Sequence, residues 1–396
     1  MTTTVRPDSD MAIPAPPTDH QTPAGASRIN GHDDRQTQNI SMKAIVQDKY
    51  GSSRVLELRD TDKPEVGEDD VLVRVNAAGV HIGDWHVMTG QPYLMRIMGF
   101  GFRAPKARVR GMDVAGTVEA VGKNVTGFQA GDDVVGICDG AFAEYACARA
   151  DKLALKPANL TFEQAAAVPT SACTALQALR GPGEIQPAQT VLINGASGGI
   201  GMFAVQIAKT FGAEVTGVCS TSKAEMIRSV GADHVVDYTQ EDFTRSGHRY
   251  DLILDMVGNR SLSQLRRALT RRGTLVLVGG EGGDRLIGAL SRSMQALVVS
   301  SFVSQRLRPV LGTANTQDLQ FLKQLIEAGK VTPVIDRAYP LSETRDAMRH
   351  LEQGHARGKI VISVRGAGPV PEGMTVAVVA STNGSPTEST LTTVTH

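Results

Sequence analysis

The stretch Thr190-Val-Leu-Ile-Asn-Gly-Ala-Ser-Gly-Gly-Ile-Gly-Met-Phe-Ala-Val-Gln-Ile-Ala-Lys209 decides the fold of this chain. Its first residues, 190–193, are apolar and typical of a buried parallel strand. A glycine-rich turn over residues 195–201 follows, and apolar residues then recur at the spacing of a helix. Glycines let the backbone approach a pyrophosphate closely, and a helix N-terminus offers free N–H groups to its charge. The stretch therefore predicts a nucleotide-binding site.

An ordinary strand-to-helix turn would contain similar glycines, so the sequence around the turn has to support this interpretation. Downstream, short apolar runs alternate with helical patterns. We expect strands at residues 214–218, 234–236, 252–254, 274–278 and 295–300, and helices at residues 223–230 and 261–269. Strands that alternate with helices predict an α/β fold with a doubly wound parallel sheet.

The end of the second strand, residues 214–218, bears on which dinucleotide binds. NAD-binding sheets usually have an Asp or Glu there, which accepts hydrogen bonds from the ribose hydroxyls. Here the segment reads Val218-Cys-Ser-Thr-Ser-Lys223, with hydroxyls and a lysine but no acid. Hydroxyls donate hydrogen bonds to a 2′-phosphate and a lysine supplies positive charge, so we expect NADPH rather than NADH. Alternatively, Lys223 is a solvated helix residue and Ser222 only caps that helix.

The composition limits the partners of the chain. Lys and Arg together number 41, as do Asp and Glu, and no basic face is evident, so we expect no nucleic-acid partner. No apolar run reaches the roughly 18 residues that span a bilayer, and we expect no membrane partner. The four cysteines form neither a C-x-x-C pair nor a plausible disulfide or zinc framework, which fits a reducing, cytoplasmic location.

The 396 residues divide into five segments. Residues 1–41 and 367–396 are rich in small and polar residues and in proline, and we expect both to be disordered tails. Residues 42–165 show glycine-punctuated strand patterns, which predict a partly barrel-like β domain. Residues 166–305 contain the nucleotide-binding pattern, and residues 306–366 read as two helices and a strand.

Several motifs outside the glycine turn resemble those of the medium-chain dehydrogenase/reductase superfamily, and within it the zinc-free quinone oxidoreductase-like branch. They are Ala78-Gly-Val-His-Ile-Gly-Asp-Trp85, Gly111-Met-Asp-Val-Ala-Gly-Thr-Val118, Gly131-Asp-Asp-Val-Val-Gly136, Asp255-Met-Val-Gly258 and Gly358-Lys-Ile-Val-Ile362. Together they are far more specific than the glycine turn alone. The resemblance, which covers about residues 42–365, implies a GroES-like β domain, an inserted Rossmann domain and a C-terminal return to the first domain.

The resemblance also implies a set of cofactor-binding residues. Those expected at the pyrophosphate are Ser197, Gly198, Gly199 and Ile200, and those expected at the 2′-phosphate are Ser220, Ser222, Lys223 and Tyr238. Those expected at the nicotinamide end are Val278, Gly279, Gly280, Thr170 and Thr174, with Lys359 closing the cofactor site from the C-terminal side.

The same resemblance permits a test for metal. Zinc-dependent members place a Cys where this chain has His81, a His where it has Met112, and a Cys or His near Thr170. A catalytic zinc needs about three good N, S or O ligands, and a thioether and a hydroxyl are poor ones. We therefore expect an enzyme without a metal.

Without a Lewis acid, the enzyme needs an acceptor that takes hydride readily, such as a quinone or an α,β-unsaturated carbonyl. His81 is the candidate donor to the oxygen on which negative charge develops, with Asp84 as the second candidate, more plausibly a support than a reacting group. Related chains commonly carry Asn at the His81 position, so His81 could instead relay a proton or simply pack.

Residues 90–110 combine Met95, Met98, Phe100 and Phe102 with several arginines. We interpret this segment as a substrate-side loop. A mobile surface loop is the alternative.

The sequence thus predicts an NADPH-dependent, zinc-free oxidoreductase that transfers hydride to a conjugated carbonyl on a small-molecule substrate. The alternatives are a metal-free alcohol dehydrogenase or carbonyl reductase, and a non-catalytic NADPH-binding sensor or scaffold. The resemblance also implies a homodimer that pairs through the edge of the Rossmann sheet, a role with which the apolar residues 295–300 are compatible.

Overall fold

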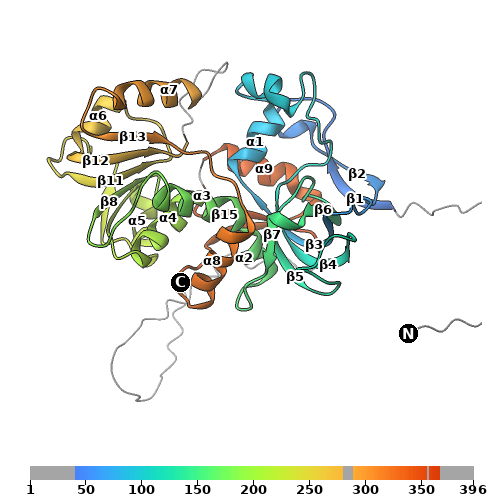
Figure 1. Ribbon diagram of the computed structural model, residues 1–396. Helices are drawn as coiled ribbons and strands as arrows, with labels where there is room; N and C mark the ends of the chain where they lie inside the picture. Colours follow the sequence, from blue (N-terminus) through green and yellow to red (C-terminus); the bar gives the residue numbers. More distant parts are fainter. Residues whose placement is uncertain (1–40, 280–288, 355, 366–396) are drawn as a thin grey trace, which may run out of the picture. The chain divides into compact units, whose positions relative to one another are not determined.

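The computed structural model describes residues 41–279, 289–354 and 356–365 (Figure 1). These residues form two large sheets, one parallel and one mostly antiparallel, together with the helices that connect their strands. The predicted tails fall outside this range, except that the first strand begins at Ser41, the last residue of the predicted N-terminal tail.

The parallel sheet has six strands in the order β10-β9-β8-β11-β12-β13. The strands are β8 (Thr190–Asn194), β9 (Glu214–Cys219), β10 (His234–Asp237), β11 (Tyr250–Asp255), β12 (Leu269–Leu277) and β13 (Arg306–Pro309), and the helices between them are α4 (Gly199–Thr210), α5 (Ala224–Ser229), α6 (Leu262–Arg267) and α7 (Ala289–Ser300). The strand order reverses between β8 and β11, and sheets of this kind bind ligands at the carboxyl ends of the strands beside such a point. The predicted fold class is confirmed.

One predicted strand is wrong. Residues 295–300 belong to helix α7, and the sixth strand of the sheet is β13. Within the run, Ala296 is fully buried and Val299, three residues on, packs against the same cluster, which is the spacing of a helix. A short apolar run is ambiguous in sequence because a buried strand and one face of a helix look alike.

The second large sheet has seven strands in the order β14-β15-β3-β4-β5-β7, with β6 paired to β3. They are β3 (Asp70–Val80), β4 (Asp113–Val121), β5 (Asp133–Ile137), β6 (Tyr145–Arg149), β7 (Leu153–Leu155), β14 (Ile335–Pro340) and β15 (Lys359–Ser363), and a separate antiparallel pair is formed by β1 (Ser41–Val46) and β2 (Glu57–Asp62). β15 follows the parallel sheet in the chain and yet pairs antiparallel with β3, with Ile360 opposite Val80. This pairing returns the C-terminal part of the chain to the N-terminal sheet.

The remaining helices are α1 (Ile82–Thr89), α2 (Phe162–Ala166), α3 (Pro169–Arg180), α8 (Thr316–Glu327) and α9 (Thr344–Glu352). None of the described helices has the length and apolar character needed to cross a bilayer.

One buried apolar cluster joins the two sheets. It contains Ala115 and Val361 from the antiparallel sheet, Leu176 from α3, Phe203 from α4 and Ile193 from the parallel sheet. Burial of apolar surface stabilises the fold by about 25 cal/mol per Å². Helix α3 contacts α4, which follows the glycine turn, and also strands β4 and β5 of the antiparallel sheet, so it connects the nucleotide-binding part to that sheet.

Gly201→Ala should destabilise the protein, because a Cβ at this position would lie 2.2 Å from the carbonyl oxygen of Gly195. Overpacking of this kind costs about 1–3 kcal/mol. Gly127→Ala is the matched control, since its added Cβ would have no atom within 4 Å, and we expect it to change the free energy of unfolding by less than about 0.5 kcal/mol. Urea unfolding followed by circular dichroism measures both. Equal stability of the two variants would contradict the tight turn.

Candidate active site

The glycine turn lies between β8 and α4, at the carboxyl edge of the parallel sheet. Gly195 has a φ of 90°, which L side chains rarely adopt, and Gly198 caps α4 without any side-chain hydrogen bond. The first N–H groups of α4 are therefore free of a capping side chain and face the end of the strand. This geometry fits a pyrophosphate, which the predicted residues Ser197, Gly199 and Ile200 would meet at the start of the helix.

The residues predicted at the 2′-phosphate gather at the end of β9. The hydroxyl oxygens of Ser220 and Ser222 lie 3.5 Å apart, and the backbone N–H of Tyr238 donates to the carbonyl oxygen of Cys219 at 3.1 Å. Lys223 Nζ donates to the carbonyl oxygen of Ala356 at 2.8 Å, so this lysine also contacts the segment before β15.

Charges around Lys223 refine this picture. Burial lowers the pKa of Lys223, and the nearby positive charge of Arg357 lowers it further, while Asp336 opposes both. Asp237, at the end of β10, accepts hydrogen bonds from the hydroxyls of Thr221 and Thr239, which hold the pKa of its carboxyl below the usual value. The end of β9 therefore carries two cations, Lys223 and Arg357. The nearby carboxylate of Asp237 already accepts hydrogen bonds from threonine hydroxyls.

Three of the residues predicted at the nicotinamide end, Val278, Gly279 and Gly280, follow β12 in the sequence. The backbone N–H of Val278 donates to the carbonyl oxygen of Asp255 at 3.0 Å, and a Cβ on Gly279 would lie 2.9 Å from the carbonyl oxygen of Met256. Gly280 lies outside the described residues. A side chain at position 279 would therefore collide with the backbone that follows β11, and it would also obstruct a ring stacked above this position.

Asp255 itself is fully buried and braces this edge of the sheet. It accepts hydrogen bonds from Asn194 at 2.8 Å and from the backbone N–H of Gly258 at 3.2 Å, and it pairs with Arg292 of α7 at 2.6 Å. The carboxylate therefore fixes the ends of β8 and β11 and does not point a free oxygen at a substrate.

His81 lies at the start of α1, directly after β3, and is buried. Its Nδ1 accepts a hydrogen bond from the backbone N–H of Gly83 at 3.0 Å, so the neutral ring carries its proton on Nε2. Nε2 is buried and has no hydrogen-bond partner among the residues that the structure describes. It lies 3.6 Å from Asp84 Oδ2 and 3.9 Å from Asp113 Oδ1, beyond hydrogen-bond distance of both.

Asp84 occupies the third position of the same helix and completes its capping box. Its Oδ2 accepts a hydrogen bond from the backbone N–H of His81 at 3.0 Å, while its Oδ1 has no partner in the described part of the chain. Burial raises the pKa of this carboxyl, and the neighbouring His81 opposes the shift. Asp84 therefore holds His81 in place by capping the helix, which is a supporting role.

Asp113, the first residue of β4, connects the antiparallel sheet to the start of helix α3. It is fully buried, and its Oδ1 accepts hydrogen bonds from both the backbone N–H and the hydroxyl of Thr170, at the start of α3. Its Oδ2 lies 3.8 Å from Nζ of Lys359. The hydroxyl of Thr174 donates to the carbonyl oxygen of Thr170 at 2.7 Å, so both predicted threonines are bound to the local structure.

Lys359 is only 2% exposed and its ammonium lies among groups from β3, β4 and helix α3. It donates to the carbonyl oxygen of Val80 at 3.1 Å and to the hydroxyl of Ser171 at 3.0 Å. A Cβ on Gly199 would lie 3.0 Å from Lys359 Cδ, which places the lysine chain against the glycine turn. Burial lowers the pKa of Lys359, and Asp113 acts against that shift.

The structure places the predicted residues that it describes at the glycine turn, at the end of β9, after β12 and around His81. Three residues that the sequence did not single out as site residues contribute: Asp113, Ser171 and Arg357. Asp113 had a signal, because an acid within the apolar run Met112-Asp-Val-Ala115 must be buried with a partner. The other two had none, since their partners are distant in sequence.

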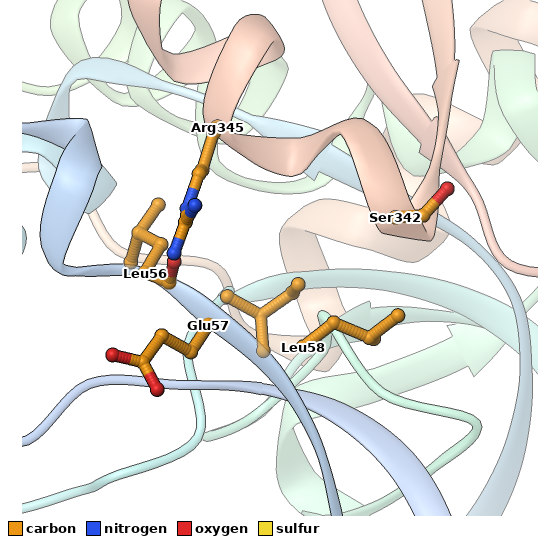
Figure 2. A pocket seen from close by; sticks show the side chains of 6 residues that line it. Leu56, Glu57, Leu58, Ser342 and Arg345 are labelled. Atoms are coloured by element: carbon orange, nitrogen blue, oxygen red, sulfur yellow. The ribbon is translucent and has the colours of Figure 1, made fainter.

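A cavity of about 370 Å³ lies elsewhere in the antiparallel part of the structure (Figure 2). Its lining residues are Ile45, Leu56, Glu57, Leu58, Ser342 and Arg345. The Arg345 side chain points to the backbone of Leu56, to whose carbonyl oxygen its Nε donates (Figure 2). No predicted site residue lines this cavity, so it is distinct from the candidate active site.

Comparisons with known proteins show the family to which this chain belongs. Two family models match, the alcohol dehydrogenase GroES-like domain over residues 67–158 and the zinc-binding dehydrogenase over residues 230–362. The 2-methylene-furan-3-one reductase of Solanum lycopersicum is 33% identical over 339 residues, which cover 81% of this chain and 79% of that protein. The chloroplastic NADPH-dependent alkenal/one oxidoreductase of Arabidopsis thaliana is likewise 33% identical, with the same coverage of both chains.

Among solved structures, the quinone oxidoreductase from Coxiella burnetii superposes with a TM-score of 0.73 at 31% identity, covering 82% of this chain and 100% of that one. These relatives, together with the fold and its glycine turn, identify a nicotinamide-dependent oxidoreductase. The chain belongs to the medium-chain dehydrogenase/reductase superfamily, in its quinone oxidoreductase-like branch.

The raised pKa of Asp84 predicts a pH dependence. Its folded-state pKa lies above the unfolded value, so ionisation of the carboxyl destabilises the folded protein. This penalty is absent below the unfolded-state pKa and reaches its full size above the folded-state pKa. Asp84→Asn removes this titration and keeps an acceptor for the His81 N–H. The stability of Asp84→Asn relative to the parent should therefore rise as the pH increases from about 4 through the raised pKa, and then level off.

Urea unfolding at a series of pH values measures this difference. Asp62→Asn, at an exposed position of β2, is the control and should show no such rise. A relative stability of Asp84→Asn that falls with increasing pH would contradict the buried environment of Asp84.

Proposed function

We propose that this oxidoreductase uses NADPH, without a metal ion, to reduce a conjugated carbonyl, either a quinone or an α,β-unsaturated ketone or aldehyde. The observation that carries the proposal is the buried Nε2 of His81, which has no hydrogen-bond partner among the described residues and lies beside the Asp113–Thr170–Lys359 group. The relatives support the substrate class, because their names describe reductases of an enone, an alkenal and a quinone.

The donor set around His81 supports the absence of zinc. Met112 offers only a thioether, and the hydroxyl of Thr170 already donates to Asp113. The ammonium of Lys359 lies 3.8 Å from Asp113, where a dication would be repelled. Among the described residues, no group of three His, Cys, Asp or Glu side chains is arranged to hold a metal. These residues do not fit a tetrahedral zinc site.

His81 is the residue that we assign to the reacting carbonyl. Bound NADPH supplies the hydride. With Nδ1 occupied by the Gly83 N–H, Nε2–H is the free donor and would hydrogen-bond the oxygen on which charge develops. Asp84 fixes the helix start that aims the ring, and Lys359 holds β15 against the glycine turn. Burial excludes water, which strengthens such a hydrogen bond.

The direct test is NADPH oxidation with a panel containing a benzoquinone, a naphthoquinone, an enone and a simple ketone, each with and without a chelator. We expect turnover of the conjugated acceptors that the chelator does not change. Turnover of the simple ketone alone would favour a carbonyl reductase or alcohol dehydrogenase. NADPH binding without turnover of any acceptor would favour a sensor or scaffold and would contradict the proposal.

Two substitutions of His81 separate its chemical role from its structural one. His81→Asn keeps a side chain that can cap α1, whereas His81→Ala removes the cap and should cost about 1 kcal/mol of stability. If Nε2–H assists catalysis, kcat should fall about tenfold or more in both variants, even though only the alanine variant loses stability. If His81→Asn leaves kcat unchanged while His81→Ala lowers stability, His81 acts only as the N-terminal cap of α1.

Cofactor choice is tested at Lys223. The proposal of NADPH rests on Ser220, Ser222, Lys223 and Arg357 at the end of β9. Lys223→Ala should raise the KM for NADPH about tenfold and leave the KM for NADH nearly unchanged, because a charged hydrogen bond is worth about 1.5–3 kcal/mol. Lys330→Ala, at an exposed position after α8, is the control. An equal rise in both KM values would show that Lys223 only supports the fold.

We further propose a homodimer and a reducing location such as the cytoplasm. β13 is the edge strand of the parallel sheet, and the adjoining α7 exposes Leu290, Met294, Leu297 and Val298, which an interface could cover. Sedimentation velocity would contradict the dimer if the protein ran as a monomer at micromolar concentration.

The cysteines support the reducing location. All four are free, and burial raises the pKa of each thiol, so none has the character of a reactive thiolate.

A further inference from the structure

The segment that follows α1 exposes large apolar side chains at its surface. Ile97 is 74% exposed, Met98 69% and Phe102 73%, and Phe100 between them is also exposed. We call residues 97–106 the finger. So many exposed apolar side chains within six positions form a patch of the kind that marks an interaction site.

The base of the finger is fixed, although its tip is exposed. The guanidinium of Arg96 lies 4.3 Å from the ring centre of Tyr50 and 4.7 Å from that of Tyr93, and its Nε donates to the carbonyl oxygen of Gly90 at 2.9 Å. The hydroxyl of Tyr50 donates to the carbonyl oxygen of Gly101 at 2.6 Å. The apolar side chains therefore stand on an ordered support that holds them away from the core.

The charged residues within the segment 90–110 are all basic. Residues 90–110 contain four arginines and one lysine, and no Asp or Glu. Arg103 and Lys106 are exposed and have no ion-pair partner among the residues that the structure describes. Arg108 pairs with Asp48, but that carboxylate also pairs with Arg59, so it leaves no net negative charge beside the finger.

We propose that the finger docks onto the surface of an anionic lipid bilayer. Ile97, Met98 and Phe102 would enter the boundary between headgroups and acyl chains, while Arg103 and Lys106 contact the anionic headgroups. Apolar side chains flanked by cations are the chemistry of such interfacial contacts. A second copy of this chain is a poorer fit, since a two-fold interface would bring the same cations together.

This inference differs from the expectation of no membrane partner. That expectation rested on the lack of an apolar run long enough to span a bilayer, and surface docking needs no such run. The inference stands independently of the proposed function, because it concerns lipid binding and not turnover.

Co-sedimentation of the full-length protein with phosphatidylcholine vesicles, with or without phosphatidylserine, tests the proposal. We expect binding to the phosphatidylserine vesicles only, and its loss at about 0.5 M salt, where charges are screened. Ile97→Ser combined with Phe102→Ser should weaken binding at least about tenfold. Arg103→Gln combined with Lys106→Gln should weaken it by about fivefold for each cation.

Phe302→Ser is the matched control, because Phe302 is 84% exposed but lies after α7, away from the finger in sequence. It should bind vesicles as the parent does. A melting temperature equal to that of the parent would show that a variant retains the fold.

Three outcomes would overturn the proposal. The first is a parent protein that does not bind phosphatidylserine vesicles at low salt. The second is a finger variant that binds them as well as the parent but sediments as a smaller species without lipid, which would make the finger an interface between copies. The third is unchanged vesicle binding with a raised KM for a soluble enone, which would make the finger a substrate contact.

Discussion

The buried ammonium of Lys359 is the constraint on which the rest of the site depends. A charge removed from water is costly unless its hydrogen bonds are satisfied, and here the acceptors come from different elements. Val80 of β3 and Ser171 of α3 accept from Nζ, Asp113 of β4 lies 3.8 Å away, and the lysine chain packs on Gly199. The antiparallel sheet, the bridging helix and the cofactor turn are therefore held in one arrangement.

Around that ammonium, three polar atoms lack a hydrogen-bond partner in the part of the chain that the structure covers. They are His81 Nε2, Asp84 Oδ1 and Asp113 Oδ2, and all three are buried. Unpaired buried polar atoms are rare in native proteins and call for an explanation such as a catalytic role. Three of them within one group, next to a turn shaped for a dinucleotide, distinguish this position from the cavity near Arg345, whose polar groups are more open to solvent. His81 and Asp255 differ in the same respect. Nε2 of His81 is unpaired among the described residues, whereas both carboxylate oxygens of Asp255 are bound, one by Asn194 and the other by Arg292.

Helix α1 connects this chemistry to the surface. Its first turn is capped by His81 and Asp84, and its C-terminus leads through residues 90–96 into the finger. A short, capped helix transmits position well because its ends are fixed by hydrogen bonds and by the packing of Val87 and Met88. His81 and the apolar finger thus belong to one continuous segment of the chain, residues 81–106.

The sequence by itself determined the local features. Residues 190–209 indicated strand, turn and helix, because glycine content and periodicity are properties of neighbouring residues, and the motif set indicated the family. It failed at residues 295–300, where only packing of Ala296 against the sheet decides between strand and helix. The tertiary structure alone decided the pairing of Asp113 with Thr170, 57 positions apart, and the approach of Arg357 to Lys223. Such contacts depend on how β15 returns to β3, and no local pattern specifies the distance between side chains that the fold brings together.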